Sequence, residues 1–206
     1  MKRFFALLLV VFTSFLSGCM SDGSGTIVLP EPEGSGRVPS SIIPDAIRAG
    51  IESSMPIYSG TTPPDISGQY RANSLKLTGS SISGDNLSNL ADVYIAFIRE
   101  SNGTLSYREK QGNSQSGSDN VIVEIVGSNN NFTAYFEADG VSAGISTKQS
   151  TVISGTLTSS GISNFNYAFV MLKKDSDPTG KLVPVNTYRT FKDGDGFAER
   201  YTWLSN

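Results

Sequence analysis

The sequence predicts an all-β fold: an antiparallel up-and-down meander of about eight strands that closes into a barrel. Apolar residues alternate with period two in four segments, 92–100, 120–127, 131–140 and 162–175. Gly, Asn, Ser and Asp cluster between them, as in Ser101-Asn102-Gly103 and the segment 127–131, and such short turns join antiparallel neighbours. A long open edge invites aggregation, so we favour a closed barrel. A two-sheet β-sandwich is the alternative.

The first 18 residues have the pattern of a secretory signal peptide. Lys2 and Arg3 precede an apolar run from Phe4 to Phe15. This run is shorter than the roughly 20 residues that span a bilayer. It therefore indicates a segment that directs export, not a transmembrane helix.

The next motif is Leu16-Ser17-Gly18-Cys19. It resembles the lipobox of bacterial lipoproteins, in which an apolar and two small residues precede a cysteine. The resemblance implies that Cys19 carries a diacylglycerol and becomes the acylated N-terminus. Several acyl chains anchor a protein stably. Met20 stands where Asp would favour retention in the inner membrane, so we expect a cell-envelope protein anchored by its lipid, in the outer membrane.

A polar tether and a short helix follow. Residues 19–39 are rich in Gly, Ser, Pro and Glu, which favours an extended linker. Within 40–55, Ile43, Ile47, Ile51 and Met55 recur at helical spacing. We expect Ser40 or Ser41 to cap this helix, Pro44 to occupy its first turn, and the helix to pack at one end of the barrel.

The β-domain is expected over 56–206. Weaker strand patterns add to the four clear ones, at 67–78, 104–110, 147–158, 181–191 and 198–204. Cys19 is the only cysteine, so no disulfide stabilises the domain. Its stability must come from an apolar core.

The segment Ile66-Ser67-Gly68-Gln69-Tyr70 resembles the start of calycins, the lipocalin and avidin-like barrels, which begin their first strand with Gly-x-Trp after a short helical segment. The chain is similar in layout to bacterial lipoproteins with a lipocalin-like barrel. The resemblance implies that Gly68 and Tyr70 pack at one barrel end, Tyr70 standing where Trp is usual. It further implies that a late arginine, Arg189 or Arg200, lies over the ring.

Composition excludes several classes of function. The formal net charge is −3, and it becomes more negative once Lys2 and Arg3 are removed, so we expect no nucleic-acid partner. With no histidine, Ser-His-Asp catalysis and histidine-ligated zinc or haem are excluded. Glu124 and Glu137 could serve as a carboxylate pair only if they shared a cavity. We predict a protein that is not an enzyme and has no catalytic residues.

The segment 191–200 offers three carboxylates, Asp193, Asp195 and Glu199, around two glycines. Oxygen ligands of this kind hold calcium. The alternative is a hairpin turn, for which Asp-Gly is well suited. We favour the turn and expect no metal or other cofactor, with calcium as the weaker alternative.

An eight-stranded barrel either holds one small ligand or fills itself with side chains. Phe165, Tyr167, Phe169 and Met171 share one face of a strand and are the predicted lining of a ligand cavity. We expect a binding module for a small, partly apolar ligand. The alternative is a structural lipoprotein of the envelope with a filled core, which binds a protein partner.

Overall fold

The computed structural model describes residues 42–88, 90–112 and 121–204. They belong to one compact unit, Glu31–Asn206. One helix and eleven strands occur among them: α1 (Asp45–Ser54), β1 (Gly68–Ala72), β2 (Lys76–Ser80), β3 (Val93–Arg99), β4 (Leu105–Gln111), β5 (Val121–Ile122), β6 (Glu124–Ser128), β7 (Asn131–Ser142), β8 (Ile145–Leu157), β9 (Gly161–Lys174), β10 (Thr187–Lys192) and β11 (Phe197–Arg200).

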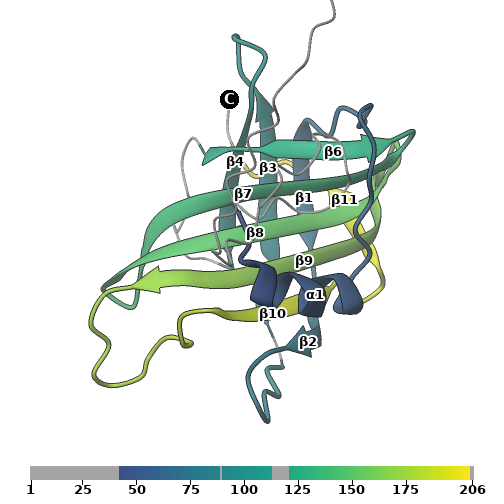
Figure 1. Cartoon of the computed structure of the whole chain (residues 1–206). Helices are drawn as coiled ribbons and strands as arrows, with labels where there is room; N and C mark the ends of the chain where they lie inside the picture. Colours follow the sequence, from purple (N-terminus) through teal and green to yellow (C-terminus); the bar gives the residue numbers. More distant parts are fainter. Residues whose placement is uncertain (1–41, 89, 113–120, 205–206) are drawn as a thin grey trace, which may run out of the picture. The chain divides into compact units, whose positions relative to one another are not determined.

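The strands form a single antiparallel sheet that curls into a nearly closed barrel, which confirms the predicted fold class. The order is β5-β4-β3-β1-β11-β9-β8-β7-β6, and β10 pairs with β2 and β9. Figure 1 shows β6, β7, β8 and β9 one beside the next, in front of β1, β3 and β4. One continuous sheet replaces the alternative of two stacked sheets.

Three chain segments hold two strands each, so the eleven strands amount to an eight-segment meander. The first segment, β1 and β2, pairs with the last, β10 and β11. The segment 121–128 joins its two neighbours in succession: β5 pairs with β4, and β6 pairs with β7. Each segment therefore lies between its chain neighbours, as an up-and-down barrel requires.

Strand bounds follow the predicted patterns, with several differences. The predicted strands 67–78 and 120–127 are each interrupted, the first at 73–75 and the second at Val123. Residues 181–186 precede β10 and form part of a loop, where we expected strand. Residues 201–204 lie beyond β11, and there the backbone amides of Trp203 and Leu204 donate to Oε1 of Gln69, both at 2.8 Å. This terminal segment covers the outer side of β1.

The barrel interior holds the larger core, and period-two alternation decides which residues belong to it. Tyr70, Phe97, Tyr107, Phe132 and Phe165 are all buried there. Tyr70 packs edge-on against Phe97, with ring centroids 6.3 Å apart, an arrangement that aromatic rings favour. This aromatic cluster fills one part of the interior.

The second core lies between α1 and the outer face of the barrel. The four predicted helix residues, Ile43, Ile47, Ile51 and Met55, are buried there against apolar side chains of β7, β8 and β9. Figure 1 shows α1 lying across β9 and β10. The helix therefore lies on the side of the barrel, where it covers apolar residues that point outward, and not at an end as we expected.

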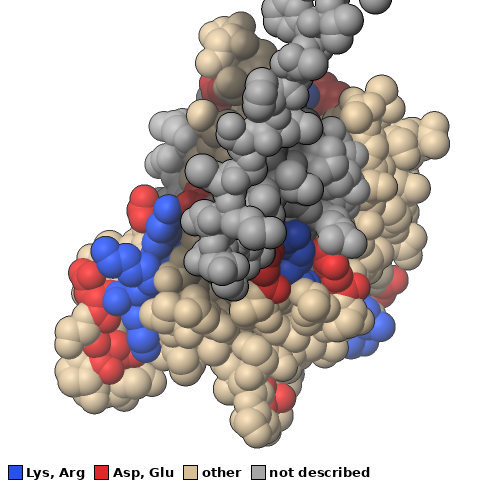
Figure 2. Space-filling view, in the orientation of Figure 1, with Lys and Arg blue, Asp and Glu red and all other residues tan. Residues whose placement is uncertain are grey.

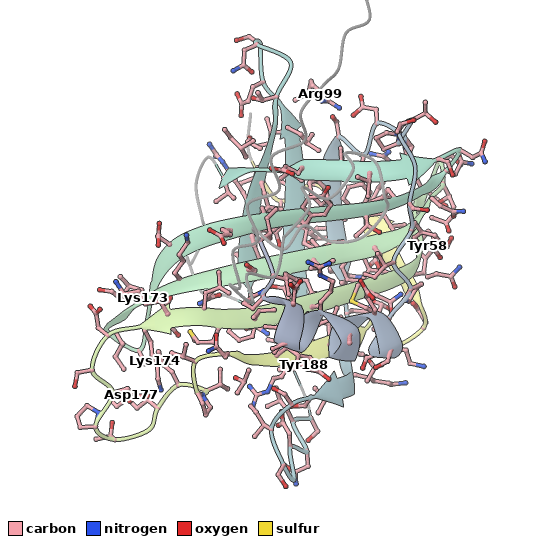
Figure 3. The ribbon with its side chains drawn as sticks, in the orientation of Figure 1. Tyr58, Arg99, Lys173, Lys174, Asp177 and Tyr188 are labelled. Carbon is pink, nitrogen blue, oxygen red and sulfur yellow. The ribbon has the colours of Figure 1, made fainter. Side chains whose placement is uncertain are left out.

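The start of α1 differs from the prediction: Pro44 precedes the first turn instead of occupying it, and the expected caps Ser40 and Ser41 lie outside the described residues. Pro44 is the N-cap, and no side chain caps the helix. Asp45 and Arg48 form an ion pair one turn apart. Gly50 allows close packing on β10, because a Cβ there would lie 2.6 Å from Cζ of Tyr188, the tyrosine that Figure 3 labels beneath the helix.

Candidate functional site

The barrel holds a cavity of about 640 Å³ at one end. Small-molecule sites typically measure about 300–1,000 Å³. Its walls come from the ends of β3, β4, β7, β8, β9 and β10 and from the loops 81–92 and 175–186. Its apolar lining includes Leu75, Leu87, Leu90, Val93, Phe169, Met171, Leu182, Val183 and Phe191.

Three of the four predicted lining residues reach this cavity. Tyr167, Phe169 and Met171 line it. Phe165 does not; it is fully buried in the aromatic core deeper in the barrel. The four side chains share the inward face of β9. Only Tyr167, Phe169 and Met171, which are nearer the open end of the barrel, line the cavity.

The opposite end of the barrel is filled, with Gly68 and Tyr70 at the start of β1. The hydroxyl of Tyr70 donates to the carbonyl of Ile66 at 2.9 Å. Arg200 of β11 lies over the Tyr70 ring, with Cζ 5.2 Å from the ring centroid. Gly68 has a φ of +147°, and a Cβ there would overlap the Arg200 guanidinium, so glycine is required in this corner.

Arg189, the other arginine considered for that position, is at the cavity instead. Its Nε donates to Oδ2 of Asp85 at 2.7 Å, and its Nη2 donates to Oδ1 at 3.2 Å. This ion pair lowers the pKa of Asp85. The pair joins the loop 81–92 to β10 and fixes that part of the cavity wall.

Glu109 is an acidic residue inside the barrel. It follows Leu105 and Tyr107 at period two on β4 and lines the cavity. The hydroxyls of Tyr107 and Tyr167 both donate to its Oε2, Tyr167 at 3.1 Å. Burial raises the pKa of Glu109, while the two tyrosine hydrogen bonds oppose that rise. Sequence reasoning missed this residue, although the alternation Leu105, Tyr107, Glu109 is the signal that finds it.

The loop 175–186 forms part of the cavity rim and is held by one carboxylate. Lys174 donates to Oδ2 of Asp177 at 2.8 Å, and the amides of Lys181 and Leu182 donate to the same carboxylate at 2.9 Å. These contacts lower the pKa of Asp177 to about 2. Figure 3 labels Lys174 and Asp177 where the chain leaves β9.

The rim carries charges of both signs. Lys148 of β8 forms an ion pair with Glu137 of β7, and Asp139 lies opposite Lys148 in the strand register. Figure 2 shows basic and acidic side chains gathered together at the ends of β7, β8 and β9. The rim therefore has no single strong sign of charge.

The two glutamates considered as a carboxylate pair do not meet in the cavity. Glu124 is exposed, and Glu137 pairs with Lys148. Glu124 is opposite Tyr135, whose side chain belongs to the core under α1. Both glutamate side chains therefore lie on the outward-facing side of their strands.

The three carboxylates considered for calcium do not form one cluster: Asp193 binds backbone amides, and Glu199 binds an arginine. Asp193 is fully buried and accepts hydrogen bonds from the amides of Asn73 at 2.7 Å, Asp195 at 3.0 Å and Phe197 at 3.3 Å. Glu199 is bound to Arg71, with Nε donating to Oε1 at 2.7 Å. Within 42–88, 90–112 and 121–204, no three His, Cys, Asp or Glu side chains are placed to hold a metal.

The lipobox residues Leu16, Ser17, Gly18 and Cys19, with the tether, lie outside the described residues. In the part of the chain that the structure describes, no helix has the length and apolar character to cross a bilayer.

The comparisons with known proteins identify no relative of this chain. No protein-family model matches the chain, and neither a curated protein nor a solved structure is significantly similar to it.

Proposed function

We propose that this protein is a lipid-anchored, non-enzymatic binding module that holds a small, partly apolar ligand in a lipocalin-like barrel. The observation that carries the proposal is the cavity of about 640 Å³. Its walls combine apolar side chains with polar and charged ones, namely Glu109, Gln111, Asp139, Ser142, Gln149, Lys181 and Arg189, and such a mixed lining suits a ligand that is only partly apolar. A barrel with a wholly filled core has no such space.

The filled end supports the kinship with calycins. Arg200 lies over Tyr70, which is the contact that the resemblance implies. This end of the barrel is filled, so a ligand could enter only from the other end. The cavity is at that opposite end, bordered by the loops 81–92 and 175–186. A ligand would enter between these loops.

The anchor follows from the lipobox. Acylated Cys19, followed by a polar tether, would hold the barrel at the outer membrane with its cavity in the aqueous phase. Metabolic labelling with palmitate should modify the wild-type chain and leave the Cys19→Ser variant unlabelled. Equal labelling of the two chains would overturn the anchor.

Binding can be tested on the Cys19→Ser chain, which cannot be lipidated and can be purified without detergent. N-phenyl-1-naphthylamine, which fluoresces in apolar sites, should bind with one-to-one stoichiometry. Ala138→Trp, on the cavity wall, should abolish that binding, while circular dichroism stays unchanged. Native mass spectrometry should show a co-purified small molecule that the Ala138→Trp chain lacks.

A folded wild-type chain that binds neither probe nor co-purified molecule would overturn the proposal. That outcome would favour the alternative, a structural lipoprotein of the envelope. Ile122 on β5, which is 66% exposed, would then be a first position to test for contact with a partner protein.

A further inference from the structure

The carboxyl group of Glu109 is unusual because it lies in an apolar barrel interior and faces a cavity. Its Oε2 accepts two tyrosine hydrogen bonds. Within the described ranges of the chain, no hydrogen bond or ion pair is formed by its Oε1. One oxygen is thus held in place by the protein, and the other is left for whatever occupies the cavity.

Two basic residues, Arg189 and Lys181, line the cavity. Arg189 forms its bidentate pair with Asp85. Lys181 is exposed at the rim, in the loop that Asp177 holds. Among the described residues, no Lys or Arg forms an ion pair with Glu109. A buried carboxylate without a cation is unfavourable, and a ligand that supplies one removes that penalty.

The surroundings of Glu109 determine the rest of the ligand. Tyr167, whose hydroxyl contacts the carboxylate, is followed on the same strand face by Phe169 and Met171, which also line the cavity. A positive group at Glu109 would therefore be next to apolar and aromatic side chains. Aromatic faces attract cations as well as apolar groups.

We propose that the ligand of this cavity is an amphipathic amine, whose ammonium group binds Oε1 of Glu109 and whose apolar part packs on Phe169 and Met171. This inference rests on the proposed binding function and names the ligand class. An anionic amphiphile such as a fatty acid would place its own carboxylate against Glu109, and like charges at close range repel. A neutral alcohol could donate a hydrogen bond but would not supply the charge.

The test compares three ligands of equal chain length on the Cys19→Ser chain at pH 7. Decylamine, decanol and decanoate each compete with N-phenyl-1-naphthylamine. Decylamine should displace the probe at concentrations at least about tenfold lower than decanol, since a charge-assisted hydrogen bond contributes more than a neutral one. Decanoate should be the weakest of the three.

Glu109→Gln should abolish the preference for decylamine over decanol. Glu124→Gln is the matched control, because it makes the same change at an exposed position on the outer side of the barrel and should leave the preference intact. The comparison of the three ligands on unaltered Glu109 does not depend on any cavity variant folding.

The outcomes separate the two proposals. Binding of the probe and of decanol without a preference for decylamine, or a preference for decanoate, would overturn the amine inference and leave the binding function standing. A preference that survives Glu109→Gln would also overturn it. Absence of all binding by the folded chain would overturn both.

Discussion

The guanidinium of Arg200, on the last strand, lies over the ring of Tyr70, on the first, with Cζ 5.2 Å from the ring centroid. Its Nη1 also approaches the carbonyl of Ser67 at 3.5 Å. The contact closes the filled end of the barrel. It joins two strands that are distant in the sequence and adjacent in the sheet.

Arg200→Ala should lower the free energy of unfolding by about 0.5–1 kcal/mol, the usual range when the cation is exposed, as Arg200 is above the buried Tyr70 ring. Urea denaturation would measure the change. Lys192→Ala removes an exposed cation from β10 and should have a smaller effect. Equal stability of the Arg200→Ala and wild-type chains would show that the stacking does not stabilise this end.

Gly161→Ala should destabilise the barrel by about 2 kcal/mol or more, because overpacking forces the backbone to move. A Cβ at residue 161 would overlap the carbonyl oxygen of Ala198 and lie 2.9 Å from Cζ of Phe197. Gly140→Ala is the control, since its Cβ would meet only Oγ1 of Thr147, at 3.8 Å. The reverse order of stability in thermal unfolding would contradict this account of the β9–β11 contact.

Asp193→Ala should cost about 3 kcal/mol, since three backbone amides lose a charged acceptor. Asn73 lies between β1 and β2, and Asp195 lies between β10 and β11, so the loss would loosen the first and last segments together. Asp195→Ala, which removes a carboxyl that is not buried, should cost less. Hydrogen exchange at the amide of Asn73, which donates to Asp193 and not to Asp195, should speed up in the Asp193 variant alone.

The same carboxyl gives a distinctive pH dependence. Burial, followed by the neighbouring Asp195, raises the pKa of Asp193 from 3.8 to about 6. A raised pKa means that the folded state binds the proton more tightly, so the contribution of Asp193 grows as the pH falls from above 6 towards 4. The stability difference between wild type and Asp193→Asn should therefore increase from pH 7.5 to pH 4.5 in urea titrations. A difference that shrinks over this range would refute the assignment.

Asp85 should behave in the opposite way. Its hydrogen bond to Arg189 lowers its pKa from 3.8, so its stabilising effect is present above pH 3.8 and is lost as the pH falls through the lower folded-state value. Asp85→Asn should be less stable than wild type at pH 7, and the gap should narrow towards pH 2.5. A gap that is constant with pH would indicate that the loss comes from packing and not from the ion pair.

Tyr107→Phe should raise the pKa of Glu109 further. The Tyr107 hydrogen bond stabilises the ionised carboxylate and opposes the effect of burial. Carbon-13 NMR of the glutamate carboxyl groups would follow the titration. Tyr94→Phe, which alters a tyrosine whose ring contacts that of Tyr201 outside the barrel, should leave the titration of Glu109 unchanged. An unchanged titration in both variants would show that Tyr107 does not tune this group.

The period-two pattern predicts much of this fold because burial on one face repeats along every strand. It correctly places Phe165, Tyr167, Phe169 and Met171 on the inward face of β9. It does not say at which depth the barrel is filled, since that depends on side chains from other strands. Phe165 meets the aromatic core, whereas Phe169 and Met171 meet open space.

The position of α1 illustrates a second limit. The stripe of Ile47 and Ile51 requires an apolar partner, but the sequence does not identify which surface provides it. The outward residues Val152, Ala168 and Val170 supply that surface. Asp193 shows the same limit for polar residues: turn chemistry was predicted at this position, and the donor that reaches it from Asn73 comes from the other end of the domain.

The pairing of β1 with β11 has a consequence for the order of events during synthesis. While the chain is still emerging from the ribosome, β1 can pair with β3, but its other edge has no partner until residues 197–200 are made. Contacts between such distant residues also slow folding. The newborn domain therefore stays incomplete, with exposed strand edges, until residues 197–200 have been translated.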